Sequence, residues 1–266
     1  MMMTGSQEAD KLTLMMSGIA CRFSRMRSMR MGAAQAIAVA CVLASLTVAS
    51  FHAQQPDSSA VIRSIDAAVH ARFDAIAEYT VTEHYAVYRG SGATKPMAEM
   101  TVKTLYRRDE GKNYTILSQS GPEIVQKMAF RTLLDNEQRI NQPGNREASW
   151  FTSANYEMNL KPGGPMQLDG RECLLLVISP KRKAPNLIVG TIWVDAKDGS
   201  IVQIQGMASK SPSFWAGPTQ MTRQYINVNG FAMATHARAV ANSFLFGQPV
   251  VTIDYSDYHI QLRPAQ

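Results

Sequence analysis

Few residues of this 266-residue chain form a constellation that could do chemistry. Asp257 and His259 stand two apart in an expected strand, which would place them on one face and Asp254 on the other. Two ligands are too few for most zinc sites, which take three or four protein ligands. The chain has no G-x-S-x-G, P-loop, H-E-x-x-H or C-x-x-C motif, and no G-x-G-x-x-G after a strand. The sequence therefore predicts no catalytic residue, no metal and no cofactor.

Cys173 opens the apolar run 173–179, which is typical of a fully buried strand. A nucleophilic thiol needs a basic, accessible environment, so we interpret Cys173 as a small buried apolar residue. The other two cysteines, Cys21 and Cys41, lie in the N-terminal segment, so an internal disulfide is not expected.

The N-terminal segment resembles an export signal. Four arginines between positions 22 and 30 precede the uncharged residues 32–49, and small residues follow near Ala49 and Ala53. The alternative is a membrane anchor at residues 32–49, because a span needs about 20 residues. That stretch is only weakly hydrophobic and has no aromatic belt, which favours cleavage. We expect residues 1–53 to be a removed N-terminal extension and signal peptide, and residues 54–266 to form a single domain.

The charge balance supports this division. The whole chain has a formal charge of +6, which suggests nucleic-acid binding, but residues 1–53 contain five of its 27 basic residues and two of its 21 acidic residues. The remaining chain has a net charge of about +3, so we expect no nucleic-acid partner. Its one basic run is Lys181, Arg182 and Lys183, which we interpret either as a solvated turn or as a contact with anionic headgroups or a charged partner.

Apolar spacing predicts the elements that position these residues. A period of 3.6 residues predicts an amphipathic helix from Val61 to about Ala77, with Ser58 or Ser59 as its N-cap, and a period of two predicts strands from Tyr79 onward. A second helix is expected over Glu123–Gln138. Short glycine-containing loops then favour antiparallel pairing. The later expected strands are 173–179, 188–195, 200–208, 220–228, 233–245 and 250–260.

Large aromatic side chains are concentrated in the second half of the chain. Trp193 would lie opposite the more regular core face of its strand, which carries Ile192 and Val194. A sheet that is apolar on both faces has to be covered on both. The alternatives are an ordinary packed core and a curved sheet whose concave face holds a lipid chain. For the second, we expect the lining to include Trp193, Phe214, Trp215, Tyr225 and Phe244.

Three stretches resemble a known family: GTIWVDAKDGSIVQIQGMASKSPSFW (190–215), LDGRECLLLVISPKRK (168–183) and FGQPVVTIDYSDY (246–258). They are similar to the outer-membrane lipoprotein-sorting proteins of Gram-negative bacteria, the broad LolA-like group that includes LolB and RseB/MucB. The resemblance covers about Ser59 to Ile260. It implies an α+β, mainly antiparallel β fold, with a strongly curved, unclosed half-barrel sheet and helices packed over its concave apolar face.

The resemblance also implies a non-catalytic carrier in the periplasm. A lipid chain of ~15 methylenes loses about 12 kcal/mol on leaving water, at roughly 0.8 kcal/mol per CH₂, so it crosses an aqueous space only if sheltered. The expected cargo is lipid or an acylated lipoprotein, passed from an inner-membrane donor to an outer-membrane acceptor by a monomer. An RseB-like lipid-sensing or protein-interaction module is the alternative. A hydrolase or metalloenzyme is a third hypothesis, from another class.

Overall fold

The computed structural model describes residues 56–210, 216–243 and 248–264. The chain divides into two units, Met1–His52 and Ala53–Gln266, and the described residues all belong to the second. Three of the five predicted lining residues, Phe214, Trp215 and Phe244, lie outside the described residues.

The first described helix, α2 (Ser58–Ala75), lies where its apolar period predicts it. Asp57 is its N-cap, not either of the expected serines, because the Asp57 side chain accepts a hydrogen bond from the Ser59 backbone N–H at 3.0 Å. Val61 and Ile65, one turn apart on the apolar face, are buried. Ile76 already has extended backbone angles, so the chain passes from α2 into the first strand without a loop.

The described residues form one antiparallel sheet of eleven strands in the order β3-β2-β1-β11-β10-β9-β8-β7-β6-β4, with β5 paired to β6. Because β3 and β4 at the two ends do not pair with each other, the sheet is unclosed. The strands are β1 (Ile76–Tyr88), β2 (Ala98–Arg107), β3 (Gly111–Ser120), β4 (Tyr156–Leu160), β5 (Met166–Leu168), β6 (Arg171–Pro180), β7 (Ile188–Asp195), β8 (Ile201–Ala208), β9 (Ala216–Val228), β10 (Phe231–Ser243) and β11 (Val250–Leu262).

The second helical segment is interrupted. The expected single helix over Glu123–Gln138 is instead α3 (Glu123–Val125), a π-helical turn η1 (Gln126–Arg131) and α4 (Thr132–Ile140). A π turn inserts an extra residue into the helical ladder, and apolar periodicity alone does not reveal it. A 3₁₀ turn, η2 (Arg146–Ser149), follows.

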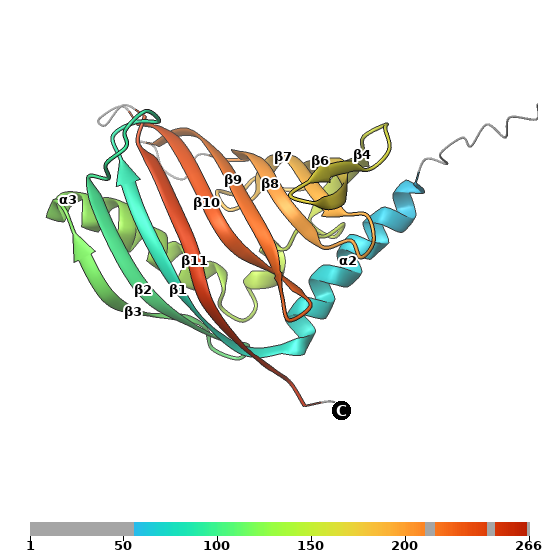
Figure 1. The fold of residues 1–266 in the computed structure, drawn as a ribbon, viewed down its shortest axis with the longest axis horizontal. Coiled ribbons are helices and arrows are strands. Elements are labelled where there is room, and N and C mark those ends of the chain that lie inside the picture. Colours follow the sequence, from blue (N-terminus) through green and yellow to red (C-terminus); the bar gives the residue numbers. More distant parts are fainter. Residues whose placement is uncertain (1–55, 211–215, 244–247, 265–266) are drawn as a thin grey trace, which may run out of the picture. The chain divides into compact units, whose positions relative to one another are not determined.

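Both helical segments pack on the same face of the sheet, which we call the inner face. Figure 1 shows α2 over one end of a curved sheet and α3 over the other. Buried residues of α2 contact strands β4 and β6–β8, whereas Phe130 of η1 contacts β1 and β2. The predicted fold class, a mainly antiparallel, unclosed sheet with helices over one apolar face, is confirmed.

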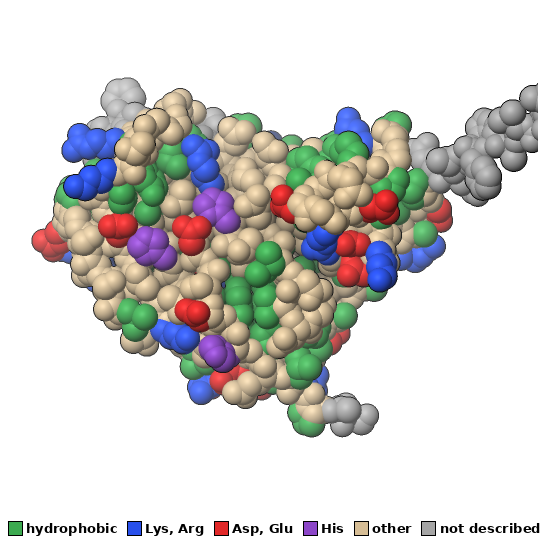
Figure 2. Space-filling model, in the orientation of Figure 1, with side chains coloured by type: hydrophobic (Ala, Val, Ile, Leu, Met, Phe, Trp, Pro, Cys, Tyr) green, Lys and Arg blue, Asp and Glu red, His purple; other side chains and the backbone are tan. Residues whose placement is uncertain are grey.

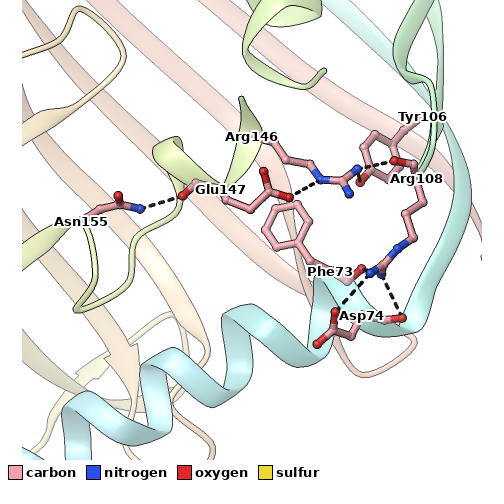
Figure 3. A network of polar contacts seen from close by, with 7 residues as sticks. All are labelled: Phe73, Asp74, Tyr106, Arg108, Arg146, Glu147 and Asn155. Carbon is pink, nitrogen blue, oxygen red and sulfur yellow. Dashed lines mark hydrogen bonds and ion pairs between the residues drawn. The ribbon is translucent and has the colours of Figure 1, made fainter. Parts of the chain in front are cut away.

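A polar network holds the end of α2 against β2 and η2 (Figure 3). Arg108 donates hydrogen bonds to the Phe73 carbonyl at 2.5 Å and pairs with Asp74 at 3.4 Å. Arg146 of η2 donates to the Tyr106 hydroxyl at 3.1 Å and to the Arg108 carbonyl. The network therefore fixes the loop that follows α4 to the C-terminal end of α2.

Candidate functional site

One row of side chains crosses nine strands on the inner face. The register pairs these residues directly from strand to strand, so all of them point to the same side. Arg223 is the only charged residue in this row. The row, from β2 to β4, reads Met100, Tyr85, Ile253, Ala237, Arg223, Ile204, Ile192, Leu176 and Leu160.

The end of the inner face under α2, which we call the α2 end, is a closed core. Ile65 of α2 and the three side chains below it on β6–β8 are almost completely shielded from solvent, at 0–1% exposure. Those three are Leu176, Ile192 and Ile204. Burial of a large aliphatic side chain contributes about 1.5–3 kcal/mol, so this cluster is a main source of the domain's stability.

The opposite end, under α3, η1 and α4, is packed less completely; we call it the α4 end. Phe130 and the strand residues around it form a core that is itself buried. Four further apolar residues of this end are each more than half exposed: Ile116, Leu117, Ile124 and Met128. A cavity of about 310 Å³ lies between the helical segment and β2–β3. Its apolar lining is Met100, Ile116, Phe130 and Leu134, and its polar lining is Gln119, Glu123, Gln126, Lys127, Arg131 and Asp135. This volume is at the small end of the range for ligand pockets.

Between the two ends, the inner face of β9–β11 is only half covered; we call this region the central strip. Its apolar side chains are Met221, Ala239, Val251 and Ile253. Each is half-buried, and the three larger ones lie at the margins of the cores at the two ends. The central strip is therefore an apolar surface that the described residues cover only in part.

Charged groups border the central strip on the side of α4. Glu137 of α4 pairs with Lys112 of β3 at 3.0 Å and with Arg223 of β9 at 3.9 Å. Burial by itself would raise the pKa of Glu137, but the two cations and a hydrogen bond from Asn141 lower it to about 2. Glu137 is thus ionised at neutral pH and fixes α4 to two strands on the sheet.

A second polar group lies deeper on the same face. Glu83 of β1 is buried and accepts hydrogen bonds from the Tyr85 hydroxyl at 2.5 Å and the Thr104 hydroxyl at 2.8 Å. The Tyr114 hydroxyl is buried and has no hydrogen-bond partner among the described residues. The inner face therefore has an interior polar region between its apolar cores.

The structure does not bring the two described lining candidates together. Tyr225 lies two residues after Arg223 on β9 and packs against the core at the α2 end, so it is on the inner face. Trp193 pairs with Gln203, which pairs with Gln224, and this row lies on the outer face. Trp193 is half-buried there. The alternation of β7 places Ile192 inward, as the sequence predicts.

The basic run at 181–183 lies on an exposed turn after β6. Lys181 donates a hydrogen bond to the Ser153 carbonyl at 2.7 Å, and Arg182 donates one to the Ala148 carbonyl at 2.5 Å. Two of the three basic side chains thus support the neighbouring loop, and contact with an external anionic partner stays a prediction.

The outer face carries histidines beside acidic side chains (Figure 2). Two imidazole–carboxylate pairs are observed, His236 with Asp254 at 2.6 Å and His84 with Glu99 at 3.4 Å. A one-residue bulge, with Asp257 at a φ of 54°, shifts the register of β11 between Ser256 and His259. His259 therefore shares a face with Asp254, and the strict alternation expected from the sequence is wrong here. Among the described residues, no group of three or more His, Cys, Asp or Glu side chains could hold a metal ion.

The sequence reasoning missed Arg223 and Glu137. Arg223 belongs to no motif, but it alternates with Met221 and Tyr225 in an expected strand, so a charge on an otherwise apolar face was a readable signal. Nothing in the sequence pairs it with Glu137, because their contact joins two elements 86 positions apart.

No protein-family model matches the chain, and no curated protein matches it. The chain is similar in fold to members of the LolA-like group among solved structures. A LolA superfamily protein from Nitrosomonas europaea is 12% identical, with a TM-score of 0.42 over 79% of this chain and 96% of that one. A candidate outer-membrane lipoprotein-sorting domain from Vibrio parahaemolyticus is 14% identical, with a TM-score of 0.41 over 74% and 91%. MucB in complex with MucA(peri) is 12% identical, with a TM-score of 0.23 over 75% and 93%.

These likenesses concern the fold alone, since all three identities are below 25% and all three TM-scores are below 0.5. In the part of the chain that the structure describes, no helix is long and apolar enough to cross a membrane.

Proposed function

We propose that this chain is a non-catalytic lipid-binding protein of the periplasm, and that its inner face shelters acyl chains of lipids or lipoproteins on their way to the outer membrane. In this proposal residues 1–53 are the export signal and residues 54–266 the carrier domain. The cargo comes from an inner-membrane donor and goes to an outer-membrane acceptor, and the carrier acts as a monomer.

The observation that carries the proposal is the central strip. Apolar side chains that stay partly accessible next to closed cores give an apolar ligand a surface to bind. Met221, Val251 and Ile253 lie on the concave, helix-bearing side of the sheet, not scattered over its outside. A flexible hydrocarbon chain fits such a surface because it gains about 0.8 kcal/mol per methylene buried and needs no directional contacts.

Tyr225 supports the same proposal because its ring is on the inner face next to the strip. We propose Tyr225 as a contact for the bound chain. The sequence-predicted lining residues at 214, 215 and 244 remain candidates for the same role. Basic residues 181–183 remain candidates for a membrane or partner contact.

The experiment is to purify the exported chain, extract it with organic solvent and identify any lipid by mass spectrometry. The delipidated protein is then titrated with a hydrophobic dye. We expect a lipid to co-purify and the dye to bind with saturation. Met221→Asp should weaken dye binding, whereas Met166→Asp, at an exposed position on β5, should leave it unchanged. A delipidated protein that binds neither lipid nor dye contradicts the proposal.

One observation favours a second candidate, an RseB-like interaction or lipid-sensing module. Strand β3 is at one end of the sheet, and its Ile116 and Leu117 are exposed. An open strand edge with apolar side chains can pair with an extended segment of another protein. A pull-down that recovers a signalling protein, together with a lipid-free purified chain, would favour this module over the carrier.

A further inference from the structure

Arg223 places a positive charge beside the apolar side chains of the central strip, and this charge favours a particular kind of ligand. Arg223 pairs in register with Ile204 on one side and Ala237 on the other, so apolar side chains flank it on the inner face. Its side chain is 36% exposed. Its polar neighbours are Tyr225, which shares a hydrogen bond with it, Tyr255 and Glu137. Placing a charge between apolar strands costs desolvation energy, which polar partners have to offset.

The cations around Arg223 outnumber its carboxylate partner. Among the described residues, Glu137 is the acidic group in ion-pair range of Arg223, and it lies 3.0 Å from Lys112 but 3.9 Å from Arg223. Lys112, with a side chain only 11% exposed, is the closer and more buried partner. Lys112 is therefore the main partner of Glu137, and Arg223 is the less closely paired and the more accessible of the two cations.

The other acidic group of this face, Glu83, acts electrostatically on Lys112 and not on Arg223. Glu83 is 1% exposed, and its two carboxylate oxygens accept hydrogen bonds from Tyr85 and Thr104. Tyr255, which influences Arg223 electrostatically, stays neutral because burial raises its pKa. The phenol next to Arg223 therefore offers a hydroxyl and no charge.

The surface next to Arg223 is apolar. Met221 is two residues away on β9, which is roughly 7 Å along the strand. Ala239 pairs with Met221, and Val251 pairs with Ala239, so apolar side chains continue across the three strands of the strip. A head group at Arg223 would thus leave its hydrocarbon tail on the strip.

We infer that the inner face selects lipids with an anionic head group, a carboxylate for example, and that Arg223 binds this head group. The guanidinium fits the geometry of a carboxylate through paired N–H donors. The inference rests on the proposed function, because it assigns the head-group chemistry of the same site.

The test uses two probes of equal chain length, dodecanoate and 1-dodecanol, below their aggregation limits. Each displaces a bound hydrophobic dye from the delipidated domain. The wild type should bind dodecanoate more tightly than dodecanol. Arg223→Met should weaken dodecanoate binding by about tenfold or more, the value of a lost charge-assisted hydrogen bond, and leave dodecanol binding unchanged. Arg223→Lys should recover part of the loss.

Two further variants keep the test decisive. Arg238→Met is the matched control, because Arg238 pairs with Thr222 on the opposite face and should affect neither probe. Glu137→Gln removes the carboxylate that competes for Arg223, so it should tighten the binding of dodecanoate and leave the binding of dodecanol unchanged. If Arg223→Met does not fold, the Glu137→Gln variant provides the test.

Equal affinity of the wild type for both probes, or unchanged dodecanoate binding in Arg223→Met, overturns the inference and leaves lipid binding intact. Weaker dodecanoate binding in a folded Glu137→Gln variant also overturns it. If neither probe binds to the wild type, the proposed function itself fails.

Discussion

The two ends of the inner face are built from similar residues but packed differently. At the α2 end, one continuous helix meets strands whose aliphatic side chains are almost fully shielded. At the α4 end, the helix is broken by a π turn, a cavity opens beside Met100 and Phe130, and an ion-pair trio takes the place of part of the apolar contact. The difference indicates that the α2 end is a main source of stability, and in the proposed function the central strip and the α4 end are the parts that adapt to a ligand.

The largest expected effect is the loss of stability when a buried residue under α2 is replaced. Ile65→Ala removes a fully buried side chain between α2 and the sheet, so it should lower the free energy of unfolding by about 2–5 kcal/mol. Ile124→Ala, at a 59% exposed position of α3, is the matched control and should change it by less than about 0.5 kcal/mol. Urea unfolding measures both. Equal effects would contradict the assignment of the core under α2 as a main source of stability.

The next largest effect is pH dependence at the α4 end. The pKa of Glu137 is about 2 in the folded chain, below its ordinary value of 4.5. As the pH falls, the Glu137 carboxylate is protonated in the unfolded chain before it is protonated in the folded chain. The stabilisation that ionised Glu137 gives the folded chain is therefore complete above pH 4.5 and disappears as the pH falls toward 2. The shift corresponds to about 3 kcal/mol at 1.36 kcal/mol per pKa unit.

Urea unfolding of wild type and Glu137→Gln at several pH values between 6 and 2 measures this effect. The wild type should lose about 3 kcal/mol more than the variant over this range. Parallel curves for the two proteins would mean that the trio does not hold α4 on the sheet.

The smallest expected effect is on the outer face. Asp254→Asn weakens the pair with His236, but the Asp254 side chain is 59% exposed, and such pairs contribute less than about 1 kcal/mol. Urea unfolding at pH 6 and pH 8 measures the change. A loss as large as that from removing the inner-face carboxylate Glu137 would contradict the contrast between the two faces.

Much of the fold follows from the sequence, for identifiable reasons. Alternation in β7 and the period of α2 predict which side chains face inward, because each pattern is local. The bulge near Asp257 and the π turn at 126–131 are one-residue irregularities that a periodic pattern does not contain. Strand β4, next to β6, was not expected, because its five residues lie between loops.

The candidate site was less predictable than the fold. The concentration of large aromatic residues predicted a lining in the second half of the chain. Of the described candidates, Tyr225 is on the inner face, whereas Trp193 is on the outer face. The central strip consists of ordinary aliphatic side chains, so its exposure depends on where the helices end on the sheet. That depends on tertiary packing, which the sequence pattern does not report.

Hydrogen exchange of the delipidated domain, with and without a saturating single-chain lipid, tests the central claim most directly. Lipid bound on the inner face should slow exchange in β9–β11 and in the α3–α4 segment, and leave β6–β8 under α2 unchanged. Slowed exchange confined to β6–β8, or no change in any strand while the lipid is bound, would contradict the account.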